Sequence, residues 1–299
     1  MLKHWIAAFR FRTLPLALAC IGMGSFLAAF YGVFQWTVCL LSLLTTLCLQ
    51  ILSNLANDYG DTIHGADSAE REGPKRSVQQ GHISRQQMKN AIIIFSILSF
   101  SCGTILLYKA LDFGSIAFYG FLIVGVMAII AAIAYTNGKR PYGYLGLGDF
   151  FVFLFFGIIG VCGTFILHSD NFELLILLPA ISCGLLATGV LNVNNIRDIN
   201  SDQKAGKLSI PVRLGQKNAK IYHVFLIMGA WLSVTFFIIN NIPSPFVFLV
   251  LLSLPLFIWH VLRLKRANTP KEIDPLLKQL ALSTLAFVLS FGFGLILSS

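Results

Sequence analysis

Two short stretches of this chain place Asn and Asp side chains four residues apart. In the first, Asp61 follows Asn57, and in the second, Asp198 follows Asn194, with Asp202 four residues further on. Because residues four apart share one face of a helix, each stretch presents its oxygen atoms together. Hard oxygen ligands without accompanying His or Cys suit Mg²⁺, which completes its coordination with water and substrate phosphate. The spacing therefore predicts a magnesium site.

Basic residues interleave with these acids in both stretches. Cations mixed with metal-binding acids in a short segment indicate a polyanionic ligand such as a diphosphate. The alternative is two sets of solvated helix ends, which accounts less well for two motifs of matched spacing. The candidate cations are Arg71, Lys75, Arg76, Lys139, Arg140, Arg197, Lys204 and Lys207.

The composition indicates the kind of protein that carries these side chains. The 299 residues are 56% hydrophobic and 12% charged, with a mean hydropathy of +0.77. This predicts an all-α polytopic membrane protein, organised as a single transmembrane domain over residues 1–299. A charged residue at the centre of a bilayer costs about 2.5–3.5 kcal/mol on insertion scales, so the acids that follow the apolar runs need a reason. The net charge of +9 is ascribed to topology and an anionic substrate, not to nucleic acid.

Nine apolar segments are long enough to cross a membrane, and each motif follows directly on one of them. The predicted spans are 13–34, 36–56, 90–108, 114–136, 149–168, 172–193, 220–239, 245–263 and 276–297.

The distribution of Lys and Arg predicts the orientation. Of the 22 such residues, all except Lys109 fall on the N-terminal side of the membrane in a nine-span topology. The positive-inside rule then places the N-terminus in the cytoplasm and the C-terminus outside. Both motifs lie on the cytoplasmic side, at the ends of the second and sixth spans, which makes them a parallel repeat.

Four longer motifs include and extend the two Asn/Asp stretches. They are Asn54-x-x-Asn57-Asp58-Tyr59-x-Asp61, Arg71-x-Gly73-Pro74-x-Arg76, Tyr135-Thr136-x-Gly138 and Asn194-Asn195-x-Arg197-Asp198-x-x-x-Asp202. With these motifs the chain resembles the UbiA superfamily of intramembrane prenyltransferases, and within it the branch that acts on 1,4-dihydroxy-2-naphthoate in menaquinone synthesis. The position occupied by a third Asp in hydroxybenzoate enzymes is Gly65 here, Asp67 comes two residues later, and Asn200 stands where some relatives have an acid.

The resemblance implies a UbiA-like fold of nine helices and a Mg²⁺-dependent transfer of a polyprenyl group from polyprenyl diphosphate to the naphthoate, with loss of CO₂ to give demethylmenaquinone. It also implies residence in the bacterial inner membrane. The catalytic acids it implies are Asp58, Asp61, Asp198 and Asp202. The implied metal ligands are Asn57, Asp58, Asp61, Asp67, Asn194, Asp198 and Asp202. The implied substrate-binding residues are Asn54, Asn57, Arg71, Lys75, Arg76, Lys139, Arg140, Asn194, Arg197, Lys204 and Lys207.

Two alternatives stay open at this point. Another aromatic acceptor, 4-hydroxybenzoate or homogentisate, would use the same site. An ion-coupled transporter would also place carboxylates within a membrane domain, although it would more often place them at the midplane and in inverted repeats.

Overall fold

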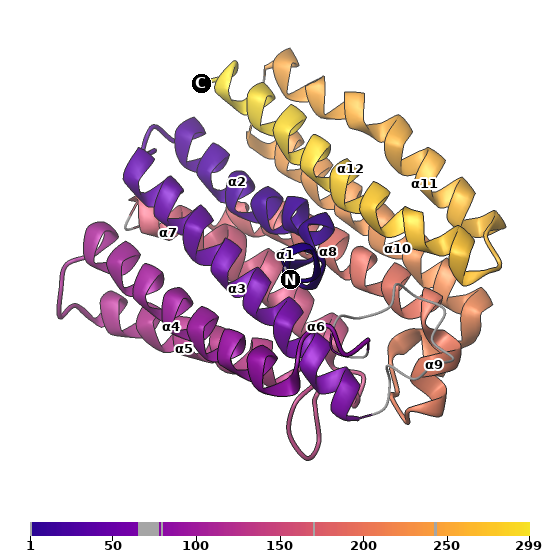
Figure 1. The fold of residues 1–299 in the computed structure, drawn as a ribbon. Coiled ribbons are helices and arrows are strands. Elements are labelled where there is room, and N and C mark those ends of the chain that lie inside the picture. The colour runs from indigo at the N-terminus through magenta and orange to yellow at the C-terminus, as the bar shows by residue number, and fades with distance from the viewer. Residues whose placement is uncertain (1, 65–77, 79, 170, 242–243) are drawn as a thin grey trace.

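The computed structural model describes residues 2–64, 78, 80–169, 171–241 and 244–299. This part of the chain contains nine helices that are long and apolar enough to cross a membrane, which confirms the predicted nine-helix, all-α architecture (Figure 1). The described elements are α1 (Leu2–Phe9), η1 (Phe11–Thr13), α2 (Leu14–Phe30), α3 (Trp36–Ile63), α4 (Arg85–Ala110), α5 (Ile116–Ala134), α6 (Gly148–Val152), η2 (Phe153–Gly163), α7 (Thr164–Ser169), η3 (Leu174–Ile176), α8 (Leu177–Arg197), α9 (Ile199–Lys204), α10 (Ile210–Asn241), η4 (Pro245–Ser253), α11 (Leu254–Arg266) and α12 (Pro270–Ile296).

The helices differ greatly in how much of each is covered by the rest of the protein. The most apolar window of the η3–α8 span is 61% buried, whereas that of α5 is 6% buried. Ile116, Ile123 and Ile130 on α5 are correspondingly exposed. Figure 1 shows α4 and α5 at one edge, α10 to α12 at the other, and α2, α3 and α8 between them. A chain with large exposed isoleucines on its outer helices is suited to lipid and not to water, so the protein is a multi-pass membrane protein.

The centre of the bundle depends on close packing between α8 and the π-helical segment η2. A Cβ on Gly157 of η2 would lie 2.6 Å from the carbonyl oxygen of Ala180 and 2.7 Å from Cα of Gly184. Only glycine permits this approach of two helix backbones. Ala180 belongs to the largest cluster of buried apolar residues in the described chain, which also includes Phe165, Phe237 and Phe287.

The helices that carry the two motifs extend beyond the predicted spans. α3 continues through Ile63 rather than ending near residue 56, and α8 continues through Arg197 rather than ending near residue 193. A span predicted from hydropathy ends where polar residues begin, but the backbone of those polar residues continues to form helical hydrogen bonds. The motif residues of the first stretch therefore lie within the last turns of a membrane helix.

Candidate functional site

A cavity of about 380 Å³ lies among α2, α3, α4, α5, η2 and α8. One end is polar and holds residues from both motifs, and the other is lined by apolar side chains from α4, α5 and η2. The motif residues at the polar end are Asn54, Asn57, Asp61, Asn194, Asp198, Asp202 and Lys207. Two stretches more than a hundred residues apart in the sequence thus meet at one cavity.

Two of the three first-motif residues that line this cavity lie in the last two turns of α3. Asn57 and Asp61, one turn apart, both line it, whereas Asp58 is 2% exposed and is not among the lining residues. Thr136 donates hydrogen bonds to the carbonyl oxygen of Ala56 (3.1 Å) and to Oδ1 of Asn57 (3.2 Å). The segment after α5 therefore fixes the orientation of the Asn57 side chain.

Asn54, one turn earlier on α3, is engaged with the N-terminal corner of the protein. Its Nδ2 donates to the carbonyl oxygen of Phe9 (2.9 Å) and to Oγ1 of Thr13 (3.1 Å). Between these two residues lies Arg10, which has φ +49°, lines the cavity, and is the only non-glycine residue with positive φ in the described part of the chain. Asn54 thus stabilises the turn from Phe9 to Thr13, which brings Arg10 to the cavity. The sequence does not indicate this role.

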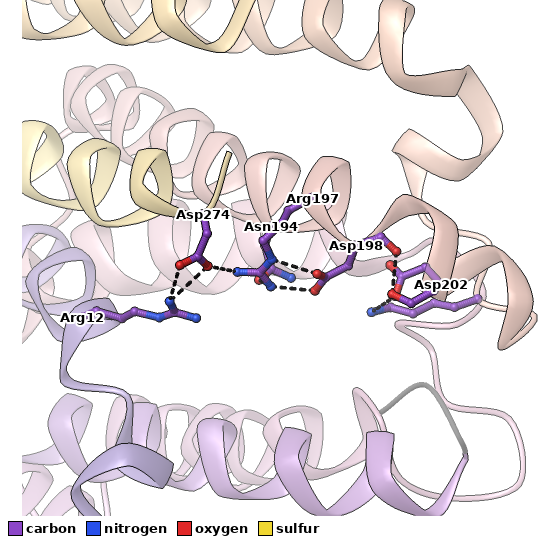
Figure 2. A network of polar contacts seen from close by, with 8 residues as sticks. Arg12, Asn194, Arg197, Asp198, Asp202 and Asp274 are labelled. Atoms are coloured by element: carbon purple, nitrogen blue, oxygen red, sulfur yellow. Dashed lines mark hydrogen bonds and ion pairs between the residues drawn. The ribbon is translucent and has the colours of Figure 1, made fainter. Parts of the chain in front are cut away.

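The second motif spans the junction of α8 and α9. Asn194 lies in the last turn of α8, Asp198 joins the two helices with φ −95° and ψ +12°, and Asp202 lies in α9. The chain bends at Asp198, so these three residues do not share one continuous helix, yet all three line the cavity. Figure 2 shows Asn194, Asp198 and Asp202 along one line of polar contacts.

Arg197 does not line the cavity but forms an ion pair with Asp198, which does. Its side chain is fully buried, and Nε and Nη2 donate to the two carboxylate oxygens of Asp198 at 2.8 and 2.6 Å (Figure 2). Nη2 also donates to Oδ1 of Asn194 at 2.9 Å. A two-pronged Arg–carboxylate pair fixes the plane of the carboxylate as well as its position.

Lys207 and Tyr144 link the two motifs. Nζ of Lys207 lies 3.4 Å from Oδ1 of Asp202 and 5.8 Å from the centre of the Tyr144 ring. The Tyr144 hydroxyl donates to Oδ1 of Asp61 at 3.1 Å. The backbone joins the same segments, because the amide of Leu208 donates to the carbonyl oxygen of Tyr144 at 2.9 Å. Nothing in the sequence indicates this hydrogen bond between Tyr144 and Asp61.

Burial and crowding of charge shape the electrostatics here. Burial raises the pKa of Asp202 to about 6, with further contributions from Asp198 and Asp61, while Lys207 acts in the opposite direction. Burial opposes the charge on Lys207, but Asp202 and Asp61 outweigh it and raise its pKa. Burial, followed by Asp61, raises the pKa of Tyr144, so its hydroxyl keeps its proton. The polar end therefore favours an added cation.

The remaining candidate cations lie elsewhere. Lys139, Arg140 and Lys204 are exposed and do not line the cavity. The candidates Asp67, Arg71, Lys75 and Arg76 lie outside the described residues.

The donor set fits a divalent cation that is shared with an anionic substrate. Oδ2 of Asp202 is buried and accepts no hydrogen bond within the described chain, so it has capacity for a ligand. Within those residues, no three His, Cys, Asp or Glu side chains are gathered closely enough to hold a metal ion by themselves. This agrees with Mg²⁺, which is commonly held by one or two carboxylates together with phosphate oxygens and water.

The apolar end of the cavity can enclose a hydrocarbon chain. Its lining includes Leu106, Phe121, Phe155, Phe156 and Ile159. A polar head site with acids and a buried lysine, continuous with an apolar chamber, matches an amphiphile with an anionic head and a hydrocarbon tail.

Comparison with known proteins places the chain among prenyltransferases. The model of the UbiA prenyltransferase family matches residues 16–295. The chain is 45% identical to the 1,4-dihydroxy-2-naphthoate octaprenyltransferase of Escherichia coli (strain K12), with 99% of this chain and 96% of that protein covered. It is 43% identical to the protein of the same name from Haemophilus influenzae, again over 99% of this chain and 96% of that protein.

The fold agrees with solved structures at much lower sequence identity. The apo structure of a UbiA homolog from Aeropyrum pernix K1 aligns with a TM-score of 0.68 at 16% identity, covering 96% of this chain and 97% of that one. A UbiA homolog from Archaeoglobus fulgidus, bound to GPP and Mg²⁺, aligns with a TM-score of 0.62 at 16% identity, covering 97% of this chain and 99% of that one.

Proposed function

The chain belongs to the UbiA prenyltransferase family, and we propose that it transfers a polyprenyl group from polyprenyl diphosphate to 1,4-dihydroxy-2-naphthoate. The observation that carries this proposal is the convergence of both Asn/Asp motifs and Lys207 at the polar end of a cavity whose other end is apolar. The acceptor follows from the two relatives that are 43% and 45% identical over nearly the whole chain. An ion-coupled transporter is not retained, because the family consists of prenyltransferases.

The reaction balances without an oxidant. The bond between C1 of the prenyl chain and the diphosphate oxygen breaks, and its electron pair leaves with diphosphate. The ring forms a carbon–carbon bond to C1, and the ring carboxylate leaves as CO₂. No electrons are removed, so the product is demethylmenaquinol, the reduced form of the demethylmenaquinone expected from the sequence.

The chain's own residues bind the diphosphate and exclude water. Lys207 offers a fixed positive charge to the diphosphate at the polar end, while Asp61, Asp198 and Asp202 provide negative charge that attracts a metal ion to the same place. Mg²⁺ bound there, through one or two of the carboxylates of Asp61, Asp198 and Asp202 together with phosphate oxygens and water, would neutralise the charge that develops on the leaving diphosphate, with the amides of Asn57 and Asn194 nearby.

The apolar lining protects the reactive end of the prenyl chain. An allylic cation formed next to water would be hydrolysed to the alcohol, so the chamber formed by residues such as Phe155 and Phe156 must keep water away until the ring attacks. The long hydrocarbon tail also explains why the enzyme is built into a membrane. An octaprenyl chain follows from the names of the relatives.

We place the protein in the bacterial inner membrane, with the N-terminus and both motifs on the cytoplasmic side. The Lys and Arg distribution supports this orientation. We further propose that residues 1–299 act as one transmembrane prenyltransferase domain, since the family match runs through nearly all of it.

Product analysis by mass spectrometry tests the function. Purified protein in detergent, with Mg²⁺ and octaprenyl diphosphate, is offered 1,4-dihydroxy-2-naphthoate, 4-hydroxybenzoate and homogentisate in separate reactions. We expect prenylation of the naphthoate, with carbon-labelled carboxylate released as CO₂ in equal amount. Prenylation of 4-hydroxybenzoate or homogentisate without turnover of the naphthoate would show that the acceptor is wrong.

A further inference from the structure

Asp274, an acid outside both motifs, is linked to the site by an ion pair with Arg197, which in turn pairs with Asp198. Asp274 lies in the second turn of α12, on a helix that contributes one apolar residue, Leu277, to the cavity lining. Its Oδ1 accepts a hydrogen bond of 2.6 Å from Nη1 of Arg197, and Arg12 of η1 lies on its other side at 3.3 Å. Figure 2 shows the resulting row from Arg12 through Asp274 and Arg197 to Asp198.

This contact completes the set of acceptors around the Arg197 guanidinium. Nε and Nη2 face Asp198, Nη2 also reaches Asn194, and Nη1 faces Asp274. A planar group held by acceptors on opposite sides cannot rotate without breaking strong, charge-assisted hydrogen bonds. Because the same plane aligns both oxygens of Asp198, Asp274 determines how Asp198 is presented to the cavity.

Charge leads to the same conclusion as geometry. Arg197 is fully buried, and if Asp198 were its sole acidic partner, its positive charge would be directed at that carboxylate alone. Asp274 is a second acidic partner, on the side of Arg197 opposite Asp198 (Figure 2), and it is not among the residues that line the cavity. The negative potential at Asp198, which a divalent cation requires, is therefore greater with Asp274 present than without it.

We propose that Asp274 is a positioning residue of the active site, which holds Arg197 and thereby sets both the orientation of Asp198 and its capacity to bind a divalent cation. The inference rests on the proposed function, because that function assigns the cation to Asp198. A purely structural role is the competing account, since the row of ion pairs also joins η1, α8 and α12.

Three variants separate charge from packing. Asp274→Asn keeps the size of the side chain and an oxygen that can accept from Arg197, but removes the charge. Asp274→Glu keeps the charge at a changed distance, and Asp274→Ala removes both. Asp112→Asn is the matched control, because Asp112 is exposed and lies between α4 and α5, at the opposite end of α4 from the motifs (Figure 1).

Metal binding is measured directly on the full-length protein in detergent. Mn²⁺ is titrated in the presence of inorganic diphosphate and followed by electron paramagnetic resonance. The thermal midpoint and the Mg²⁺ concentration for half-maximal turnover are recorded on the same samples. Loss of a group that supports a metal ligand typically lowers metal affinity about 10–100-fold.

We expect Asp274→Asn to weaken Mn²⁺ binding about tenfold and to raise the half-saturating Mg²⁺ concentration in parallel, with kcat at saturating Mg²⁺ close to wild type. Asp274→Glu should recover most of the affinity, Asp274→Ala should lose more, and Asp112→Asn should match wild type. Wild-type Mn²⁺ affinity in Asp274→Asn overturns the inference, as does a lowered thermal midpoint with unchanged affinity.

The two proposals fail in different ways. If wild-type protein transfers no prenyl group to any acceptor, the proposed function is wrong whatever the variants do. If wild-type protein is active and Asp274→Asn binds Mn²⁺ as tightly as wild type does, only the role of Asp274 is wrong.

Discussion

Gly60, within the first motif, offers a test of how closely the site is held. A Cβ added there would lie 2.5 Å from both the carbonyl oxygen and Oγ1 of Thr136, and 2.7 Å from the Thr136 carbonyl carbon. Non-bonded heavy atoms are comfortable at about 3.5 Å, so Gly60→Ala must separate α3 from the segment after α5 by about 1 Å. The contacts to the carbonyl oxygen and carbonyl carbon are to backbone atoms, which cannot move aside as a flexible side-chain end can.

The expected loss follows from what this segment holds. Thr136 orients Asn57, and the neighbouring Tyr135 lines the cavity. A displacement of about 1 Å at a catalytic site can lower turnover about 100-fold. Overpacking costs about 1–3 kcal/mol, and alanine returns about 0.5–1 kcal/mol through its better helix propensity. We therefore expect a large loss of kcat with a net destabilisation of only about 1–2 kcal/mol.

Gly120→Ala provides the matched control. Gly120 lies in α5, and an added Cβ would meet no atom within 4 Å. Turnover of octaprenyl diphosphate with the naphthoate, and thermal unfolding in detergent, are measured for both variants. Gly120→Ala should keep wild-type turnover and gain about 0.5–1 kcal/mol of stability through the better helix propensity of alanine. If Gly60→Ala behaved in the same way, the close contact with Thr136 would not constrain the site, and the reasoning would be refuted.

Three further predictions address charge and topology. Asp61→Asn and Asp198→Asn should each lose most turnover, and the double variant should be little worse, because residues that act as a unit are non-additive; raised Mg²⁺ should partly restore the single variants, and near-normal rates at limiting Mg²⁺ would contradict a shared site. Lys207→Met should raise the KM for prenyl diphosphate about 10–100-fold, since a hydrogen bond to a charged group contributes about 1.5–3 kcal/mol, whereas Lys139→Met, at an exposed position, should change it little. Alkaline phosphatase fused after Ser299 should be active in a bacterial host, and an active cytoplasmic reporter there would contradict the proposed orientation.

The sequence predicted those features that depend on composition and local spacing. The lengths of the apolar segments predicted the nine membrane-length helices found in the described residues, because a membrane span requires about 20 apolar residues whatever its neighbours are. The four-residue spacing of Asn57 and Asp61 placed both side chains at the cavity, because α3 continues through them. Acids at the ends of two spans on the same side of the membrane could meet only if those helices were adjacent in space, which spacing alone cannot show.

The parts that the sequence missed depend on tertiary contacts. The neighbourhood of Arg197 suggested a substrate-binding cation, but the structure shows it buried and paired with Asp198 and Asp274. Asp274 resembles any acid near a helix N-terminus, where the helix dipole alone would favour it. Lys139 and Arg140 share a short segment with residues that reach the site, yet both are exposed. Which side of a loop faces a cavity is determined by packing and is not encoded by residue type.

The arrangement of charges also explains how one site can bind both a metal ion and an anion. Acids alone would repel a diphosphate, and cations alone would repel the metal ion. Here Asp202 and Lys207 stand beside one another at the cavity, while Arg197 is kept behind Asp198 and out of it. In the proposed site, a metal ion would be attracted by carboxylates whose own counter-charge is partly withdrawn toward Asp274, and the diphosphate would meet the metal ion and a buried lysine. With its head bound there, the prenyl chain would lie in the apolar end of the cavity, with its reactive carbon at the boundary between the two ends.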